Sequence, residues 1–383
     1  MIEGAFIDRS AARDTIVDVV TDERAFDALR DRWNALLDDS GRWNPFLTWE
    51  WMRAWWTHLR GTAVMNIVTI SAGEELIAIA PLMAVRRGVA APQRLEFIGA
   101  GSGADYLDVI VRPGHDAAAI AAVARTLESR QLTLHLDNLP PGSVTTCLSR
   151  QLATTGWTAI GGSPDVCPFI ELTGHSWDSY LSSLGSAHRA NVRRRMRAMN
   201  AAFEVRFDAV ASAQQRELAL EALFAFHEQR WRDRGGSTAF STVALRAFHH
   251  DITHRALDAG WLRMHTLTLN NALAGVMYGF ARHGRFYFFQ HGTDAALAAS
   301  SPGLVLMALT IRAAIEDGLH EFDLLYGHEA YKTLWTRDQR PLGRLMVFPP
   351  RLMGRWLQRR AETRLAMRDF AHRLGLKRSH DTA

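Results

Sequence analysis

The chain has 383 residues, of which 48% are hydrophobic and 22% are charged, and its formal net charge is +4. These values are typical of a soluble globular protein, and the length predicts two domains of about 150 to 200 residues. Residues 351–378 hold nine Arg or Lys against two acidic residues, so the rest of the chain is close to neutral. A near-neutral body argues against a general nucleic-acid-coating protein, whose affinity grows with the number of phosphates neutralised.

The sequence carries no targeting pattern that we recognise. The N-terminus lacks a basic region followed by an apolar one, which a secretory signal requires. The longest apolar runs fall well short of the roughly 18 residues needed to span a bilayer. The only cysteines, Cys147 and Cys167, are too few for a disulfide scaffold, and we expect free thiols. We therefore expect a cytoplasmic protein.

The first half of the chain predicts a series of strands followed by a helix. Residues 65–85 alternate as two strands around a turn at Ala72 and Gly73, and residues 93–111 predict further strand. A Pro-Gly step then leads into an apolar helical pattern over 112–129.

The second half repeats this order. Residues 262–282 predict two strands around Asn270 and Asn271, and residues 285–294 predict a third. Pro302 and Gly303 begin a helix with an apolar face, and residues 320–327 predict another strand. We therefore expect an α/β (α+β) fold of two related domains, each a mixed, largely antiparallel sheet flanked by helices.

We place the domains at about 15–160 and 165–350, with a turn-rich joint at 161–168 and a basic helical tail over 351–383.

This order of elements resembles the GNAT acyltransferase fold, duplicated in tandem as in the FemAB aminoacyltransferases. The segments NPFLTWEWMRAWW, GADYLDVIV, SAHRANVRRRMR and SPGLVLMALTIRAAIEDGLHEFDLLYGHEAYKTLW are similar to the GNAT-type acyltransferases named for the cellulose-biosynthesis protein CelD. The resemblance covers about residues 20–348 and is most specific over 301–335. It implies two tandem GNAT-like domains, with the main acyl-donor site in the second.

The resemblance also implies the reaction. We expect an N-acyltransferase that uses acyl-CoA, such as acetyl-CoA, as co-substrate without a metal, and an amino sugar, sugar nucleotide or amino-acid-like amine as acceptor, with envelope polysaccharide synthesis as a possible setting. The chain lacks the Gln/Arg-x-x-Gly-x-Gly/Ala phosphate loop of typical GNAT enzymes. An aminoacyl-tRNA-dependent transferase and a non-catalytic assembly factor of a polysaccharide-synthesis complex are therefore kept as alternatives.

Candidate catalytic residues lie at strand ends. His291 and Gln290 lie at the end of the expected strand 285–292, and an imidazole suits proton transfer. The alternative is a His that donates to a backbone carbonyl. Asp323 lies inside a predicted strand, where a carboxylate needs a partner. It acts as a base or an orienting group, or it forms a salt bridge to the following helix.

The segment after this strand adds candidate binding residues. Tyr326, Tyr331 and Lys332 follow closely, and Gly303 begins the preceding helix, whose N-terminus suits a phosphate. In FemAB-like relatives the matching Lys lies close to the donor or acceptor, so we expect Lys332 to bind a phosphate or carboxylate. A surface lysine is the alternative.

Three further candidates have equally ordinary alternatives. Asp105 is a catalytic carboxylate or a turn cap, and Arg230 binds an anionic substrate or serves a helix C-terminus. Residues 186–200 predict a helix with five arginines. We expect Arg189 and Arg193 on it to hold the phosphates of one small ligand rather than nucleic acid; a solvated face is the alternative.

Four other signals are given less weight. The glycines over 99–103 lack the third Gly of the dinucleotide fingerprint. His250 and His254 lie four residues apart without a clear third metal ligand, so no metal is expected. The tryptophans over 43–56 are expected to pack in the core. The tail is expected to be a docked terminal helix, with peripheral contact to an anionic membrane as the alternative.

Overall fold

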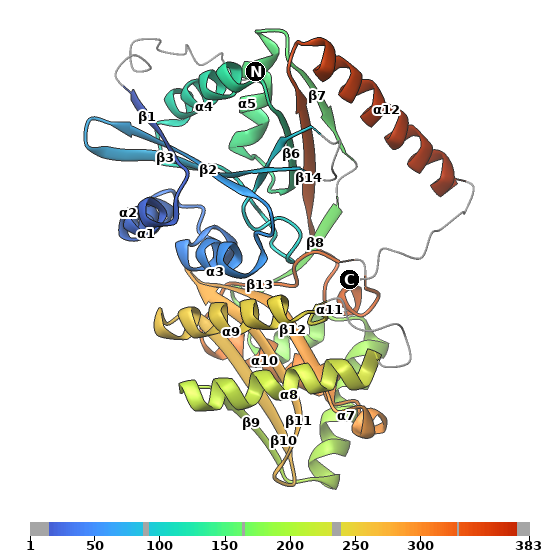
Figure 1. The fold of residues 1–383 in the computed structure, drawn as a ribbon. Coiled ribbons are helices and arrows are strands. Elements are labelled where there is room, and N and C mark those ends of the chain that lie inside the picture. Colours follow the sequence, from blue (N-terminus) through green and yellow to red (C-terminus); the bar gives the residue numbers. More distant parts are fainter. Residues whose placement is uncertain (1–14, 87–91, 163–164, 232–238, 328, 374–383) are drawn as a thin grey trace. The chain divides into compact units, whose positions relative to one another are not determined.

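The computed structural model describes residues 15–86, 92–162, 165–231, 239–327 and 329–373 (Figure 1). The chain divides into two compact units. The first consists of Met1–Trp56, Arg60–Asp165 and Pro341–Thr382, and the second of Thr57–Leu59 and Val166–Arg340, with Ala383. The domain bounds expected above stay a proposal, and each unit is described here by itself.

The first unit is a sheet in the order β1-β2-β3-β4-β6-β14, in which β5 also pairs with β3 and β7 with β14. Its strands pair antiparallel except β4 and β6. The elements are β1 (Thr15–Val20), α1 (Glu23–Ala28), α2 (Arg30–Asp39), η1 (Pro45–Leu47), α3 (Trp49–Leu59), β2 (Val64–Ala72), β3 (Glu75–Val85), β4 (Arg94–Phe97), β5 (Ile110–Val111), α4 (Asp116–Arg130), β6 (Thr133–Leu139), α5 (Val144–Ala153), β7 (Thr158–Gly161), β14 (Gln339–Phe348) and α12 (Leu352–Arg373).

The second unit has its strands in the order β8-β13-β12-β11-β10-β9, antiparallel except β12 and β13. The elements are β8 (Asp165–Glu171), α6 (Trp177–Ser183), α7 (Ser186–Ala202), β9 (Val205–Ala209), α8 (Ala213–Trp231), α9 (Val243–Asp258), β10 (Leu262–Leu269), β11 (Ala272–Arg282), β12 (Arg285–Thr293), η3 (Ala295–Ser300), α10 (Pro302–Glu316), β13 (Glu321–Asp323) and α11 (Lys332–Trp335).

Helices cover both faces of the second sheet. Helices α8 and α9 lie across one face of β10–β12 (Figure 1). The core of the other face joins residues of α6, α7 and α10 to the strands, among them Leu181, Val192 and Leu306, all buried. The expected fold class, α/β with mixed, largely antiparallel sheets flanked by helices, is confirmed.

The two predicted turns are present. Gly73, between β2 and β3, has φ +61°, and Asn270 and Asn271, between β10 and β11, have φ +49° and +64°. These left-handed conformations are the ones that Gly and Asn adopt most readily. The tryptophans of α3 pack as expected, with Trp51 fully buried and Trp55 nearly so.

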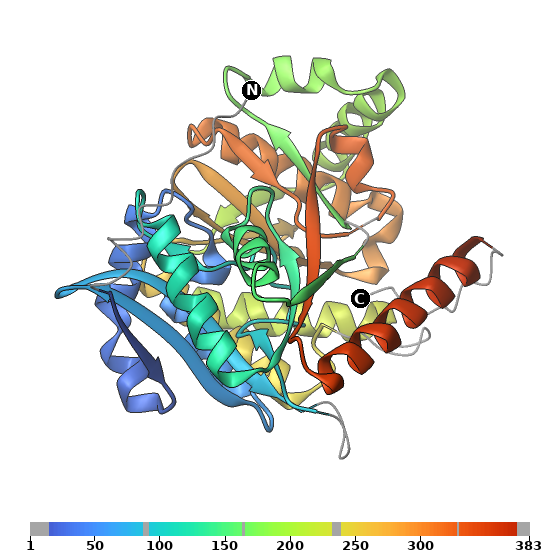
Figure 2. The same cartoon turned by 90° about the horizontal axis from the view of Figure 1, so that it is seen from above.

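Strand β14 differs from the sequence-based expectation. Residues up to 350 were expected in the second domain, but β14 pairs antiparallel with β6 and β7 of the first unit (Figure 2). In the described part of the chain, no helix is both long enough and apolar enough to cross a membrane.

Candidate functional site

Strands β12 and β13 diverge in the second unit. They pair in parallel over Arg285–Tyr287 and Glu321–Asp323, after which β13 ends while β12 continues to Thr293. In open α/β sheets, ligands bind beyond the carboxyl ends of strands at such points. We call the stretch formed by residues 288–293, 324–327 and 329–332 the strand divergence.

A β-bulge precedes the end of β12. Gly279 pairs with Phe288 and Tyr278 with Gln290, so Phe289 is the extra residue. Gly279 is needed here because a Cβ atom would collide with the Tyr287 carbonyl oxygen. A bulge bends its strand and re-aims the side chains that follow. Gln290 and His291 are therefore presented at a bend, as is common beside active sites.

His291 lies half-buried at this bend. Burial lowers the pKa of its imidazole to about 3, and the positive charges of Arg230, His227 and Lys332 act in the same direction. The ring is therefore neutral at physiological pH. The ring centroid of Tyr331 lies 6.0 Å away.

The sequence left open that the side chain of His291 donates to a backbone carbonyl. In the structure it is the backbone carbonyl of His291 that accepts a hydrogen bond. The Nε2 atom of His227 donates to the His291 carbonyl oxygen at 2.8 Å, so it is His227 that binds a backbone carbonyl. This bond fixes the backbone of β12 where the imidazole of His291 leaves the sheet.

Lys332 is a buried lysine rather than a solvated one. Its Nζ atom donates to the Tyr326 carbonyl oxygen at 2.7 Å and forms an ion pair with Glu329 at 3.0 Å. Gly327, with φ +145°, passes so close that a Cβ atom would meet Glu329 and Lys332. Lys332 thus contacts the backbone of Tyr326 on one side and the side chain of Glu329 on the other.

Asp323 is completely buried at the end of β13. Its Oδ1 atom accepts from the Leu325 amide at 2.8 Å, and its Oδ2 atom from Arg340 Nη1 at 3.0 Å. A salt bridge to the following helix was one of the two roles expected for Asp323. The salt bridge forms, but its partner, Arg340, lies in β14. Both oxygens have donors, so the geometry favours an orienting role over proton transfer.

Tyr331 and Tyr326 differ in exposure. Tyr331 begins the short helix α11, and burial raises its pKa above the usual value, so its phenol stays protonated. Tyr326 is 44% exposed, and its backbone, rather than its ring, binds Lys332. Tyr331 can therefore donate a hydrogen bond at the divergence.

The N-terminus of α10 lies at the end of the same β12–α10 connection. Its N-cap, Ser301, makes no side-chain capping bond, and the first turn holds Gly303 and no acidic residue. The first amides of a helix have no partner within the helix and favour anions. A phosphate can bind here without the glycine-rich loop that the sequence lacks.

Helix α7 lies beside that N-terminus, and its arginines have different roles. Arg195 Nη1 donates to the Ala299 carbonyl oxygen at 2.9 Å, one turn before α10. Arg189 instead donates to the Ser182 carbonyl oxygen at 2.8 Å, which caps the end of α6. Arg193 and Arg197 are exposed. Arg195 is the residue that the sequence did not single out.

Arg230 ends α8, where its side chain is exposed, and its charge lowers the pKa of His227 and His291. It therefore contributes electrostatically to the divergence. The residues that follow it over 232–238 lie outside the described part of the chain.

Two buried carboxylates of the first unit, the candidate Asp105 and its neighbour Asp108, have structural partners. Asp105 is buried and accepts from Asn138 Nδ2 at 3.2 Å. Asp108 accepts from Ser143 and Thr145 and from the Val144 amide at the start of α5. Burial raises the pKa of Asp108, and these hydrogen bonds oppose that effect. Both carboxylates therefore hold loops of the first unit in place.

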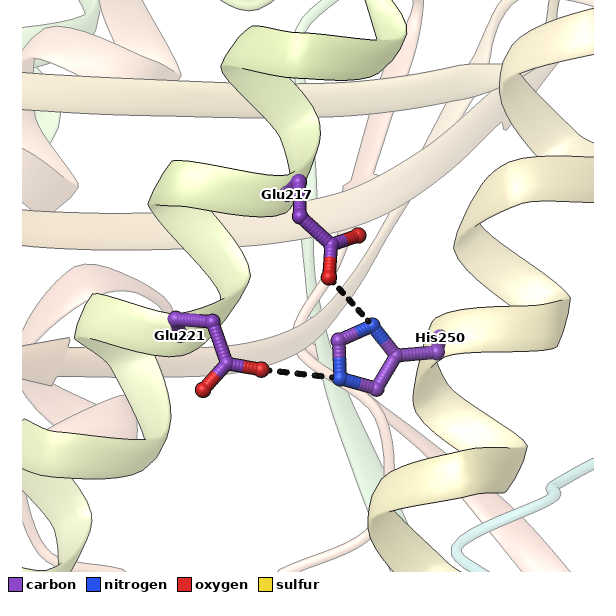
Figure 3. Close-up of side chains that lie close together, drawn as sticks. All are labelled: Glu217, Glu221 and His250. Carbon is purple, nitrogen blue, oxygen red and sulfur yellow. Dashed lines mark ion pairs between the residues drawn. The ribbon is translucent and has the colours of Figure 1, made fainter.

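His250 lies between two carboxylates (Figure 3). Its Nε2 atom is 2.9 Å from Glu221 and its Nδ1 atom 3.5 Å from Glu217, both on α8. Its expected companion His254 pairs instead with Asp258. Since the two ring nitrogens point to different carboxylates, the arrangement is that of an ion-paired histidine joining α8 to α9, although the three groups are close enough to hold a metal.

A pocket that the sequence did not reveal lies beside α11. Its volume is about 550 Å³, and it lies between the end of β8, the joint between α6 and α7, and residues 333–338. His188 and Trp335 line it, their rings edge to face at 4.7 Å. The Nε2 atom of His188 is buried without a hydrogen-bond partner, and burial lowers the pKa of this ring.

The pocket has a fixed floor and charged sides. Tyr180 donates its hydroxyl to the Trp335 carbonyl oxygen at 2.9 Å and is itself buried. Glu171, Arg337 and Asp338 supply charges of both signs. No local sequence motif marks this pocket, because its residues come from three separate segments.

Comparison with known proteins finds a family match within the second unit. Residues 186–333 match the family model described as an acetyltransferase (GNAT) domain. The GNAT-like part of the expected fold is thereby confirmed for this segment. No curated protein matches the sequence.

Solved structures share the fold over most of the chain. FemX has a TM-score of 0.61 at 10% identity, covering 82% of this chain and 95% of that chain. A protein of unknown function from Bacteroides thetaiotaomicron has a TM-score of 0.56 at 10% identity, covering 87% of this chain and 100% of that chain. The C-terminal domain of a putative lysylphosphatidylglycerol synthetase from Agrobacterium fabrum has a TM-score of 0.55 at 10% identity, covering 88% of this chain and 96% of that chain. At these identities the likeness concerns the fold alone, and the CelD-like assignment stays a prediction.

Proposed function

We propose that the chain is an N-acyltransferase that transfers an acyl group from acyl-CoA to an amine. The observation that carries this proposal is the strand divergence between β12 and β13, which presents His291 and Tyr331 to one another within the segment that matches a GNAT domain. Acyl transfer needs a free amine, a route for its proton and donors for the developing oxyanion. The acceptor supplies the amine, and the divergence offers His291 for its proton and Tyr331 as a hydrogen-bond donor.

The donor binds with its phosphates at the N-terminus of α10 and its thioester in the divergence. Arg195 stands beside this N-terminus through its bond to Ala299. Arg193 supplies further positive charge from the same helix, whose residues 186–202 include no acidic one. A phosphate gains from both the helix dipole and the guanidinium groups.

The acceptor amine attacks the thioester carbonyl directly. The new C–N bond forms as the C–S bond breaks, the amine loses one proton and the thiolate gains one. Tyr331, whose phenol stays protonated, donates a hydrogen bond to the leaving sulfur. The neutral His291 imidazole accepts the amine proton, directly or through water, and this proton then passes through water to the thiolate. Because the pKa of His291 is low, it is a weak base, and its position matters more than its basicity.

Lys332 and Asp323 act as positioning residues. Lys332 holds the loop that leads to Tyr331, and Asp323 holds the start of the same loop through the Leu325 amide. Asp105 lies in the first unit and has no part in this proposed chemistry.

The pocket beside α11 takes the acceptor. Tyr331 belongs to the strand divergence, and Trp335, four residues further along the chain, lines the pocket. Four residues of helix advance by about 6 Å, which is the distance from the divergence to the pocket along α11. An amino sugar or amino-acid-like molecule fits a pocket of about 550 Å³ whose polar sides flank an aromatic wall. The charges of Glu171 and Arg337 suit an acceptor that itself carries polar or charged groups.

The proposal is tested by incubating the protein with a panel of acyl-CoAs and amine acceptors and measuring free thiol. Acceptor-dependent thiol release that is lost in Tyr331→Phe combined with His291→Gln supports it. Thiol release that needs no acceptor, or none with any pair, contradicts it.

Aminoacyl transfer from tRNA is the second candidate, because five arginines occur on α7 without an acidic residue. Turnover of aminoacyl-tRNA in place of acyl-CoA identifies that donor. A protein that turns over neither donor and binds no coenzyme A is a non-catalytic assembly factor.

A further inference from the structure

Helix α12 carries an apolar stripe that no other described residue covers. It spans Leu352–Arg373, and its side chains are described as far as Met367. Leu352 is 86% exposed, Met353 60%, Trp356 52% and Met367 64%. Four large apolar side chains exposed on one helix are unusual for a soluble surface, and such patches mark binding surfaces.

These side chains share one face of the helix. At about 100° per residue, Leu352, Trp356, Met367 and Met353 fall within an arc of about 100°. Arg360 lies in the same arc, with its guanidinium 5.3 Å from the Trp356 ring centroid, where it covers part of that ring as a cation–π pair. We call Leu352, Met353, Trp356 and Met367 the apolar stripe.

The opposite face of α12 is the one that packs on the first unit. Gly354 is buried, and a Cβ atom there would collide with the Pro349 carbonyl oxygen. Leu357, Ala361 and Leu365 on this side are half-buried. Thr158 of β7 donates to Gln358 at 2.7 Å. The helix is therefore docked on the first unit, and the stripe points away from the contact.

Arginines flank the stripe on both sides. Seen along the helix axis, Arg355 and Arg359 lie on one edge of the stripe and Arg364 lies on the other edge. All three are exposed. Over 351–367 the chain carries five arginines and one acidic residue, Glu362, which lies outside the stripe and accepts from Gln358 at 2.9 Å. An apolar strip bordered by basic groups is the pattern of a helix that lies in a membrane interface.

We propose that α12 binds the surface of an anionic membrane, with the apolar stripe in the acyl-chain boundary and the flanking arginines at the lipid phosphates. The helix lies parallel to the surface, because it is too polar to cross it. Trp356 suits the interface, since an indole combines an apolar body with a polar N–H group. Charge complementarity selects lipid over a second copy of the chain, whose α12 would bring the same positive charges into contact.

Flotation of the full chain with vesicles tests this. We expect binding to vesicles of phosphatidylcholine with about one third phosphatidylglycerol and little binding to phosphatidylcholine alone. Raising the salt concentration weakens the binding because it screens the arginines. Each flanking arginine removed lowers the partition coefficient about fivefold, since one basic residue near an anionic surface is worth roughly 1 kcal/mol.

Matched variants show whether vesicle binding depends on the apolar stripe and its flanking arginines, or on exposed apolar and basic side chains anywhere on the surface. Leu352→Ser with Trp356→Ser should abolish vesicle binding. Leu218→Ser with Val243→Ser, which removes two side chains that are 66% and 86% exposed on α8 and α9, should leave it unchanged. Arg355→Gln with Arg359→Gln should weaken binding, whereas Arg193→Gln with Arg197→Gln on α7 should not.

Three results overturn the proposal. The first is no binding to anionic vesicles by a folded wild-type chain. The second is equal binding by the stripe variant. The third is a dimer in light scattering that dissociates in the stripe variant without any vesicle binding, because the stripe is then an interface between copies. Thermal unfolding of each variant shows whether it is folded.

Discussion

Arg340 forms an ion pair with Asp323 at the point where β12 and β13 part. The Nη1–Oδ2 distance is 3.0 Å, and the same guanidinium binds Glu321 at 2.8 Å and lies 4.5 Å from the Phe169 ring centroid. Asp323 is completely buried. Asp323 also accepts from the Leu325 amide, so this pair connects β14 to the first residues after β13.

We expect Asp323→Asn to lower the free energy of unfolding by about 3 kcal/mol, because it removes one of the two carboxylates that pair with a partly buried guanidinium. Urea unfolding followed by fluorescence measures the change. Asp208→Asn, on the exposed edge of β9, is the matched control and should change it by less than about 0.5 kcal/mol. Equal effects of the two variants would show that the pair is not needed.

Lys332→Met should lower kcat/KM about 100-fold through the position of Tyr331. The apolar side chain fills the same space but leaves the Tyr326 carbonyl oxygen without its donor. Glu329→Gln removes the exposed member of the ion pair and should change kcat/KM less than about threefold. If both variants lose activity equally, the ion pair rather than the carbonyl contact fixes the loop.

Stability should fall as pH is lowered from about 6.5 towards 4. Burial lowers the pKa of His291 to about 3 and that of His265 to about 4, so the folded state binds fewer protons than the unfolded state in this range. The stabilisation is complete above the unfolded pKa and is lost as pH falls towards the folded one. Unfolding free energies of wild type, His291→Gln and His265→Gln, measured at several pH values, give the slope of stability against pH for each protein. A variant slope as steep as that of wild type would contradict the buried neutral rings.

The arginines of α7 should separate into two groups. Arg189→Ala removes the cap on α6 and should lower Tm without changing the KM for the donor. Arg193→Ala with Arg195→Ala should raise the donor KM about tenfold with a smaller change in Tm. Steady-state kinetics with each substrate varied in turn makes the distinction. A raised donor KM in Arg189→Ala alone would return the phosphate contact to that residue.

His188→Phe should raise the KM for the acceptor and leave that for the donor unchanged. The phenyl ring keeps the edge-to-face packing on Trp335 but has no polar atom for a ligand in the pocket. An unchanged acceptor KM would place the acceptor elsewhere.

The repeated elements could be predicted because their signals are local. Hydrophobic alternation, the turn residues and the Pro-Gly step that begins α10 determine each element within a few residues of sequence. The candidate site residues His291, Tyr331 and Lys332 lie in one region, because His291 is near the end of β12 and the other two follow the adjacent strand β13. Their roles stay a prediction.

The remainder depends on contacts distant in sequence. Arg340 binds Asp323 across 17 positions, and Tyr180 binds the Trp335 backbone across 155. No periodicity encodes either pairing. Likewise, a run of arginines on a helix predicts charge but not that Arg189 caps one helix while Arg195 reaches the start of another.

Hydrogen exchange of the full chain with and without coenzyme A tests the proposed donor site most directly. The account predicts added protection in residues 288–293 of β12 and in the first turn of α10, from Ser301 to Val305, together with a rise in Tm. Protection elsewhere, or binding that leaves both segments unchanged, would contradict an acyl-CoA site at the strand divergence.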